Sequence, residues 1–125
     1  MKPDHQAAVS EVHPSNDAVV VTLHVDVLDL SAQEVFESVL GEQLDAGAHR
    51  IVLDLSEVMF CDSSGLSALL RVRRRAQAMS GWLRLTGLSG QPARIIELTN
   101  LSRVLPSYAD AATALIAPEE SPETS

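Results

Sequence analysis

The stretch RIVLDLSEVMFCDSSGLSALLRVRRRAQ, residues 50–77, decides the fold. It opens with a short, almost continuous apolar run over residues 50–55, which is typical of a buried parallel strand. After Ser64, apolar residues recur at helical spacing, at Leu66, Leu69, Val72, Ala76 and Met79. The stretch therefore predicts a buried strand, a short connector and a helix, with two adjacent serines where the helix begins.

The chain before this stretch supplies two strands and a helix. Residues 18–27 are dense in β-branched side chains and predict a strand, and a shorter strand at residues 9–12 can pair with it across a Pro-Ser-Asn-Asp turn. In the segment that follows, Ser31 and Glu34 have the spacing of a capping box, and Gly47 supplies a stop. We expect a helix between these signals.

The chain after this stretch continues the alternation. Gly81 is expected to end the second helix, residues 82–86 predict a strand, and residues 92–98 predict a short helix with a proline in its first turn. Residues 101–108 can hold a last short strand, and Asp110 can cap a final Ala-rich helix. This order predicts an α/β domain with a mixed, mostly parallel sheet of four to five strands, about four helices and an antiparallel strand at the N-terminal edge.

Length and composition favour one domain that does not bind nucleic acid. The 125 residues carry a net charge of −8, and Lys2 is the only lysine, which argues against nucleic acid as a partner. The single cysteine, Cys61, excludes an internal disulfide. Without an apolar leader or a membrane-spanning run, the chain is expected to be cytoplasmic. We expect a flexible tail at residues 1–8, a folded domain at residues 9–116 and a disordered acidic tail at residues 117–125.

The two serines leave two interpretations open on physical grounds. In the first, Asp62 or Ser63 is only the N-cap of the helix. In the second, a hydroxyl on the first turn is used chemically, because the neighbouring Gly65 leaves it easy for a partner to reach. A phosphate there would meet free backbone N–H groups and the positive end of the helix dipole.

Other chemistries are disfavoured by what the sequence lacks. Asp54 ends an apolar strand, as the phosphoacceptor of response-regulator receivers does, but no lysine follows to hold a phosphoryl group. The hydrolase pattern G-x-S-x-G, a P-loop and metal-ligand spacing are all absent, and the four histidines are scattered. We therefore predict no enzyme activity, no cofactor and no metal. Cys61 is expected in the core, and the arginines at 71 and 73–75 are expected to form a solvated face, with a docking patch as the alternative.

The stretch at residues 50–77 resembles the signature of the STAS domain, in the branch of bacterial anti-sigma factor antagonists. The family pattern is an apolar strand that ends in Asp-Leu, a connector, and Asp-Ser-Ser-Gly-Leu at the start of a helix. LDLSAQEVFESVL (residues 28–40) and PARIIELTNLSRVLPSYADAATAL (residues 92–115) are similar to other family segments. The likeness covers roughly residues 9–116 and implies a STAS fold.

The resemblance also assigns roles to residues. It implies that Ser64 is phosphorylated, and that Asp62, Ser63, Gly65 and Leu66 belong to the partner-binding surface. Asp29 matches a family aspartate near the phosphorylation site, although Asp26-Val27 stand where the family often has Gly-Glu; a solvated turn residue is the equal alternative. Of the two serines, Ser63 is expected to cap and shape the turn.

The function implied by the resemblance is partner switching. The unphosphorylated chain is expected to bind an anti-sigma factor that is a serine kinase, which releases a sigma factor in a transcriptional stress response. Phosphorylation at Ser64 ends the binding, and a PP2C-type phosphatase resets it. The alternative is a STAS module that acts as a constitutive interaction subunit, for example of a lipid-transport ABC complex.

Overall fold

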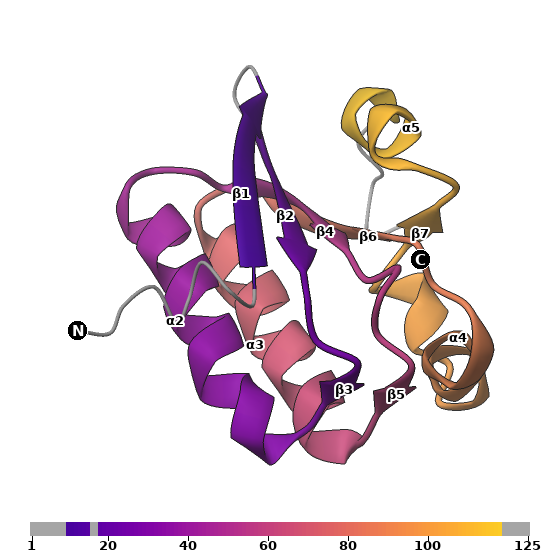
Figure 1. Ribbon diagram of the computed structural model, residues 1–125. Coiled ribbons are helices and arrows are strands. Elements are labelled where there is room, and N and C mark those ends of the chain that lie inside the picture. The colour runs from indigo at the N-terminus through magenta and orange to yellow at the C-terminus, as the bar shows by residue number, and fades with distance from the viewer. Residues whose placement is uncertain (1–9, 16–17, 119–125) are drawn as a thin grey trace.

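The computed structural model describes residues 10–15 and 18–118, which form a five-stranded sheet flanked by helices (Figure 1). The strand order is β1-β2-β4-β6-β7. The strands are β1 (Ser10–Ser15), β2 (Ala18–Leu23), β4 (Arg50–Asp54), β6 (Trp82–Thr86) and β7 (Ser107–Tyr108). β1 is antiparallel to β2, and all other neighbours are parallel. The predicted mixed, mostly parallel sheet with an antiparallel edge strand is confirmed.

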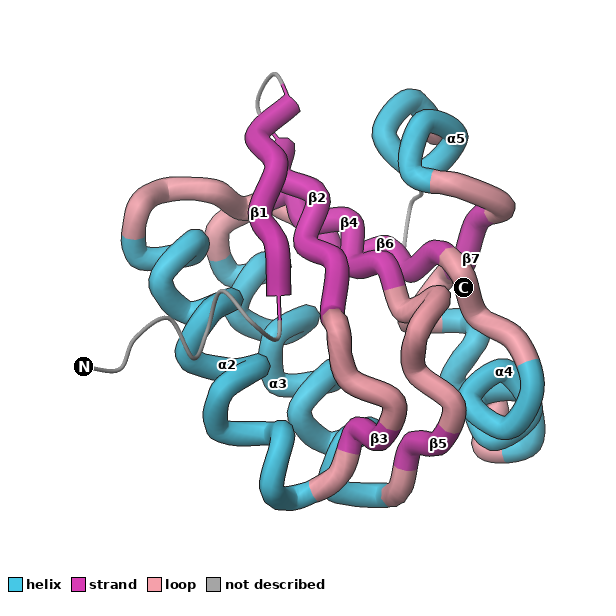
Figure 2. Tube along the Cα trace, viewed as in Figure 1, coloured by secondary structure: helices cyan, strands magenta, loops and turns pink. Residues whose placement is uncertain are grey.

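Among the described residues, four α-helices pack around this sheet, in agreement with the prediction of about four. They are α2 (Leu30–Asp45), α3 (Ser63–Ala78), α4 (Gly90–Leu98) and α5 (Ala111–Ile116), and a 3-10 helix, η1 (Leu101–Arg103), follows α4. α2 and α3 lie side by side with their N-termini at the same end of the molecule, whereas α5 lies at the opposite end (Figure 2). The N-termini of α2 and α3 therefore lie together at one end of the molecule.

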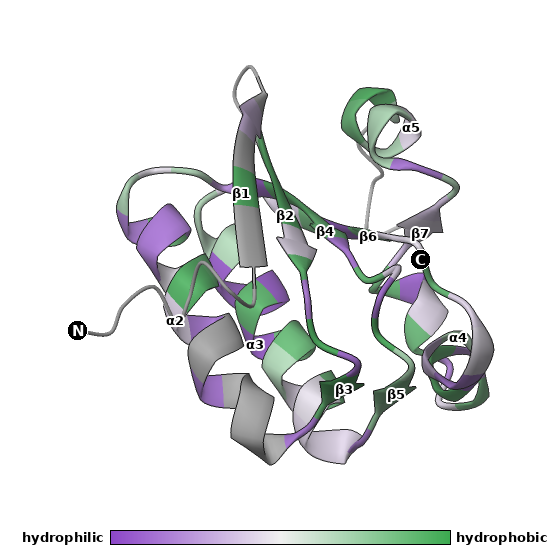
Figure 3. Ribbon diagram, in the orientation of Figure 1, coloured by the Kyte–Doolittle hydropathy of each residue, from purple (hydrophilic) through white to green (hydrophobic). Residues whose placement is uncertain are grey.

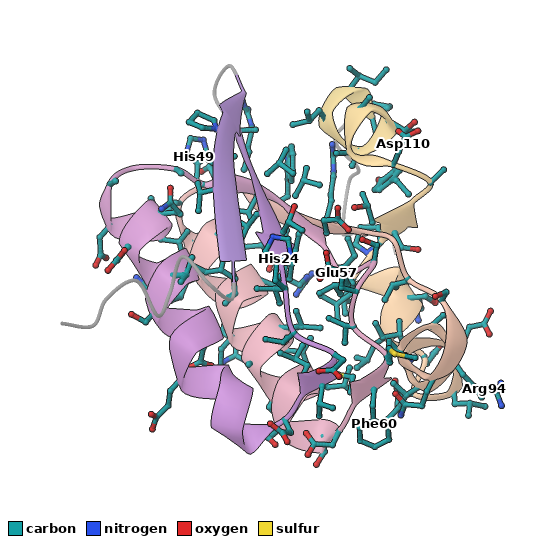
Figure 4. All side chains as sticks on the ribbon, in the orientation of Figure 1. His24, His49, Glu57, Phe60, Arg94 and Asp110 are labelled. Carbon is teal, nitrogen blue, oxygen red and sulfur yellow. The ribbon has the colours of Figure 1, made fainter. Side chains whose placement is uncertain are left out.

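A second, two-stranded sheet extends from that end. β3 (Val27–Leu28) pairs in parallel with β5 (Phe60–Cys61). β3 follows β2 after a bend at residues 24–26, and β5 follows β4, so the small sheet lies beyond the carboxyl ends of both strands (Figure 1). The prediction of one strand over residues 18–27 is wrong at this bend. His24 Nδ1 lies 3.0 Å from Glu57 Oε2, which joins the two connectors (Figure 4).

The core lies between the sheet and the pair α2 and α3. Alternate residues of the central strands point to these helices, as the period of a strand requires, and the apolar residues gather there in Figure 3. The buried residues are Val21, Leu23, Ile51, Leu53, Leu83 and Leu85 from the sheet and Val39, Leu40, Leu44, Leu69, Val72 and Ala76 from the helices. The core is built from aliphatic side chains and the Cys61 thiol, and it holds the start of α3 in place.

Two predicted helix boundaries are wrong for a physical reason. α2 begins at Leu30, so the helix starts one residue before Ser31, which the sequence predicts as its cap. α3 ends at Ala78, and Ser80 takes the left-handed conformation (φ 66°). Gly81 is needed instead for close approach, because a Cβ there would overlap the His49 carbonyl.

The terminal tails fall mostly outside the described residues, as residues 1–8 and 119–125 do. Ala117 and Pro118, which the sequence assigns to the disordered tail, are held: their carbonyls accept hydrogen bonds from the Arg84 guanidinium at 2.9 and 3.1 Å. Within the described ranges, none of the helices has the length and apolar character that a membrane crossing requires.

Candidate functional site

Asp62 is the N-cap of α3 and fixes the local geometry. Its Oδ1 accepts hydrogen bonds from the backbone N–H groups of Ser64 at 3.0 Å and Gly65 at 3.1 Å. The same oxygen accepts a third bond from the Ser64 hydroxyl at 2.9 Å. A cap of this kind satisfies helix N–H groups that have no partner within the helix. Of the two candidates for the cap, Asp62 is therefore the correct one, and the prediction that Ser63 caps the turn is wrong.

The two serines differ in their surroundings. Ser63 is the first residue of α3 and is exposed, whereas Ser64 is half-buried and its hydroxyl donates to Asp62. Because Asp62 occupies the N–H groups of Ser64 and Gly65, a phosphate on Ser64 would not find them free, contrary to the sequence-based expectation. The site can bring a hydroxyl and a carboxylate together, but it offers little to neutralise a second anion.

Gly65 and Leu66 belong to the packing of this turn. A Cβ at Gly65 would overlap the Leu28 carbonyl oxygen of β3 and would lie 2.9 Å from the Cys61 Sγ. Glycine is thus required here because the helix passes close to the neighbouring backbone. Leu66 is buried in the core. Both residues are buried and shape the loop, so the prediction that they belong to an exposed binding surface is not matched by their burial; the exposed or half-buried residues of this turn are Asp62, Ser63 and Ser64.

Asp29 occupies the position equivalent to Asp62 on the neighbouring strand. Leu28 pairs with Cys61 as the last pair of the small sheet, and Asp29 and Asp62 follow these two residues. Asp29 is half-buried and precedes α2, as Asp62 precedes α3. The structure thus places two aspartates directly before two adjacent helices.

Cys61 and Gln91 clamp the strand that leads to the cap. The Gln91 side chain accepts from the Cys61 N–H at 2.8 Å and donates to the Cys61 carbonyl at 3.0 Å, so the start of α4 holds β5. Burial, and secondarily the Asp62 carboxylate, raise the pKa of the Cys61 thiol to about 11. The thiol therefore stays protonated at neutral pH, and Cys61 is the core residue that the sequence predicts.

Sequence reasoning misses three exposed apolar residues beside the serines. Val27, Met59 and Phe60 are 38%, 72% and 46% exposed, and we call them the apolar patch. Val27 pairs with Phe60 across the small sheet, and the Asp26 carbonyl accepts from the N–H groups of Met59 and Phe60 at 2.7 and 3.1 Å. Phe60 lies on β5, directly before the start of α3 (Figure 4). Exposed apolar groups rimmed by polar residues mark interaction surfaces.

The other candidate residues have structural roles. The Asp54 side chain accepts from the Ser56 N–H at 2.9 Å and so closes a turn. Arg71 pairs with Glu37 (2.6 Å) and Arg75 with Asp45 (3.2 Å), both across α2 and α3. Among residues 10–15 and 18–118, no cluster of three His, Cys, Asp or Glu side chains could hold a metal ion.

Sequence comparisons connect this arrangement to known proteins. The family model described as the STAS domain matches residues 8–114. BtrV of Bordetella bronchiseptica, a candidate anti-sigma factor antagonist, is 27% identical over 90 residues, which are 72% of this chain and 78% of BtrV.

Comparisons with solved structures also match anti-sigma factor antagonists. The crystal structure of a candidate anti-sigma factor antagonist from Thermotoga maritima matches with a TM-score of 0.76 at 25% identity and covers 90% of this chain and 96% of that chain. The anti-sigma factor antagonist SpoIIAA in its unphosphorylated form matches with a TM-score of 0.68 at 21% identity and covers 81% and 89% of the two chains. At the latter identity the likeness concerns the fold alone.

Proposed function

Since the chain belongs to the STAS domain family, whose anti-sigma factor antagonists are regulators and not enzymes, we propose that it works as a phosphorylation-controlled antagonist of an anti-sigma factor. The unphosphorylated chain binds an anti-sigma factor that is itself a serine kinase, and a sigma factor is released. The kinase then phosphorylates Ser64, and the complex dissociates. A PP2C-type phosphatase restores the binding form.

One observation carries this proposal: the Ser64 hydroxyl lies at the start of α3, beside exposed apolar side chains that need a partner to bury them. The phosphoacceptor and the apolar patch share one end of the molecule because β5 leads directly from Phe60 to the Asp62 cap. A modification at Ser64 therefore acts at the edge of the proposed interface.

The apolar patch supplies affinity in this proposal. Large apolar side chains near the centre of an interface dominate the binding energy, and the polar groups around them exclude water. Phe60 and Met59 are the anchors, and Asp62, Ser63 and Asp29 form the polar surroundings. The turn is held by the Asp62 cap and the Gln91 clamp, so its backbone is already ordered before binding, which lowers the cost of association.

Phosphorylation opposes binding through charge. A phosphate on Ser64 adds about −1.5 to −2 charges at pH 7 beside the Asp62 carboxylate. In the unphosphorylated chain this carboxylate accepts a hydrogen bond from the Ser64 hydroxyl, and phosphorylation removes the hydrogen of that bond. The N–H groups of Ser64 and Gly65 do not neutralise it, because Asp62 already binds them. A charge that is buried in an interface without a counter-charge costs several kcal/mol, and about 1.4 kcal/mol is a tenfold change in affinity.

Phosphate transfer with a matched pair of variants tests this proposal. The chain is incubated with its cognate anti-sigma factor and ATP, and the intact mass is measured. We expect a gain of about 80 daltons for one phosphate in wild type and in Ser63→Ala, and no gain in Ser64→Ala. A gain that persists in Ser64→Ala and disappears in Ser63→Ala would move the acceptor to the exposed neighbour. Tight binding without any phosphate transfer would favour the constitutive interaction subunit.

A further inference from the structure

A cavity of about 310 Å³ with aromatic and cationic walls lies away from the serines. It lies between the C-terminal half of α3, the first residues of β6 and the segment between η1 and β7. Its walls include Arg73, Trp82, Arg84, Arg103 and Tyr108. Pockets for small ligands have volumes from about 300 Å³ upward, so the cavity is large enough for a small organic molecule.

The aromatic part of the wall is held in place by Arg84. This arginine is 3% exposed, and its guanidinium lies 3.9 Å from the centroid of the Trp82 ring and 5.7 Å from that of the Tyr108 ring. Its N–H groups donate to three backbone carbonyls in and after α5, so the guanidinium cannot move away from the rings without breaking these bonds. Aromatic side chains that are fixed in this way offer a preformed surface for a flat apolar group.

The positive charge of the cavity has no counter-charge in the part of the chain that the structure describes. Arg71 and Arg75 have carboxylate partners, but Arg73 and Arg103 have none among residues 10–15 and 18–118. The bonds of Arg84 go to neutral carbonyls, and burial lowers the pKa of Arg73. Cations that are partly buried without a partner are stabilised by an anion, so the cavity selects a negatively charged ligand.

The backbone of Leu83 adds a neutral donor to the same wall. In the register of the sheet, β7 pairs with Leu85 and Thr86 and does not reach Leu83, and the Leu85 N–H donates to the Pro106 carbonyl at 2.9 Å. Alternate residues of a strand turn their backbone groups to the same neighbour, so the Leu83 N–H points to the side of β7, where the cavity lies. A backbone N–H without a strand partner requires an acceptor.

We propose that this cavity binds a small organic carboxylate with a flat apolar body, such as an aromatic acid. A carboxylate has two acceptor oxygens, which guanidinium groups bind in a bidentate manner, and Arg73, Arg103 and the Leu83 N–H are the donors for them. The body of the ligand packs against Trp82 and Tyr108. An inorganic anion would satisfy the donors and leave these rings uncovered.

The ligand site is separate from the proposed phosphorylation switch. The serines are the first and second residues of α3, whereas the cavity is lined by Arg73 and Gln77 of the same helix. Binding of the carboxylate is therefore expected to be the same in wild type and in Ser64→Ala. Failure of the switch would leave this proposal standing, and failure of this proposal would leave the switch standing.

An NMR titration with benzoate tests the proposal on the full chain. The ¹⁵N-labelled protein is titrated at constant ionic strength, and the signals of the Trp82 indole N–H and the Leu83 amide are recorded; Trp82 is the only tryptophan. We expect both signals to shift in a saturable manner, with Kd in the millimolar range or tighter. Benzamide has the same shape without the charge and is expected to bind at least about tenfold more weakly.

Two double variants show whether the cavity is the site. Arg73→Gln/Arg103→Gln is expected to weaken benzoate binding by at least about tenfold, because both unpaired cations are removed. Arg74→Gln/Arg94→Gln removes the same charge from exposed residues that do not line the cavity and is expected to leave Kd unchanged. The amide spectrum of each variant checks that it is folded.

Four results would overturn the proposal. The first is the absence of a saturable shift at Trp82 and Leu83, and the second is equal binding of benzamide and benzoate. The third is an equal loss of affinity in the two double variants, which would mean that net charge alone attracts the ligand. The fourth is inorganic phosphate that binds as tightly as benzoate, which would assign the cavity to small inorganic anions.

Discussion

A single oxygen, Asp62 Oδ1, holds the start of α3 together through three hydrogen bonds. The same contacts make the position sensitive to charge, because the N–H groups that could stabilise an added anion are already bound. Gly65 allows the helix to start this close to β3. At the scale of residues, the site is therefore a rigid turn whose electrostatic balance depends on one carboxylate and one hydroxyl.

The close approach at Gly65 predicts a loss of stability in Gly65→Ala. We expect the free energy of unfolding to fall by about 1–3 kcal/mol, because the new methyl group must displace the Leu28 backbone and the Cys61 side chain. Urea unfolding measures this free energy. The control is Gly41→Ala, where the nearest atom to the new methyl is the Arg75 Nη1 at 3.2 Å, the end of a flexible side chain. Alanine there is expected to stabilise the helix by roughly 0.5–1 kcal/mol. Equal stabilities of Gly65→Ala and wild type would contradict the packing described here.

The charge balance at Asp62 predicts an unfavourable coupling with an acidic side chain at residue 64. In a double-mutant cycle, Asp62→Asn keeps an acceptor for the cap and removes the charge. We expect the change in the free energy of unfolding caused by Asp62→Asn to be more stabilising in the Ser64→Glu background than in wild type, by about 0.5–1 kcal/mol. Thermal unfolding of the four proteins measures this difference. The same cycle with Ser63→Glu, at the exposed neighbour, is expected to give a smaller coupling. Zero coupling at Ser64 would mean that Asp62 does not oppose an anion there.

At the scale of elements, α5 depends on a residue of the sheet. It has six residues, too few for an isolated helix to be stable in water. Asp110 caps its first turn by accepting from the Thr113 N–H at 2.8 Å. Arg84, buried in β6, donates to the carbonyls of Ala114, Ala117 and Pro118 at 2.7, 2.9 and 3.1 Å. One guanidinium thus satisfies the carbonyls at the C-terminal end of the helix.

This anchoring predicts that Arg84→Met releases α5. We expect a loss of about 2–4 kcal/mol in unfolding free energy, because the carbonyls lose charged donors and a buried side chain changes shape. Hydrogen exchange of the amides from Ala114 to Ala117 should accelerate more than that of β4. Arg94→Met, on an exposed position of α4, is expected to change stability by less than about 0.5 kcal/mol. Unchanged protection of α5 in Arg84→Met would refute the anchoring role.

Long elements are the part of the fold that the sequence predicts well. β4 is marked by an almost continuous apolar run, α2 and α3 by apolar residues at helical spacing, and β6 by its place between turn signals. The structure confirms all four within a few residues. β3 and β5 have two residues each, too few for any period to show. Ser31 and Gly81 are misinterpreted because local signals suggest helix ends, whereas α2 begins one residue before Ser31 and the chain passes close to His49 at Gly81.

The candidate site also has one part that the sequence predicts and another part that it does not. Asp62 follows from the general preference of aspartate for helix N-caps, so the sequence is sufficient to propose it. The apolar patch could not be predicted, because the exposure of Met59 and Phe60 depends on the small sheet extending beyond the main one. The Gln91 clamp joins residues 30 positions apart and has no local pattern.

At the scale of the whole molecule, the two ends of α3 serve different surfaces. The N-terminal end carries the serines and adjoins the apolar patch, and the C-terminal half contributes Arg73 and Gln77 to a cavity of about 310 Å³ beside β6. α2 and α3 pack side by side and are also joined by the ion pairs of Arg71 and Arg75. We call this helix pair, which carries the serines at one end, the platform. We expect a partner to bind this platform as a rigid body.

The position of the apolar patch predicts which apolar residues affect binding. Phe60→Ala is expected to weaken binding to the cognate anti-sigma factor by at least about tenfold, as for a buried aromatic anchor. The control is Ile116→Ala, which removes an even more exposed apolar side chain (82%) on α5, at the opposite end of the molecule (Figure 1). Isothermal titration calorimetry measures both. If Ile116→Ala weakens binding as much as Phe60→Ala does, the partner does not bind at the patch.

The most direct test compares the affinity of one preparation for its cognate anti-sigma factor before and after stoichiometric phosphorylation. We predict that Kd rises by about two orders of magnitude or more on phosphorylation at Ser64, and that treatment with a PP2C-type phosphatase restores the original value. Ser64→Ala treated in parallel should keep the affinity of the unphosphorylated chain throughout. An unchanged Kd for the chain phosphorylated at Ser64 would contradict the account.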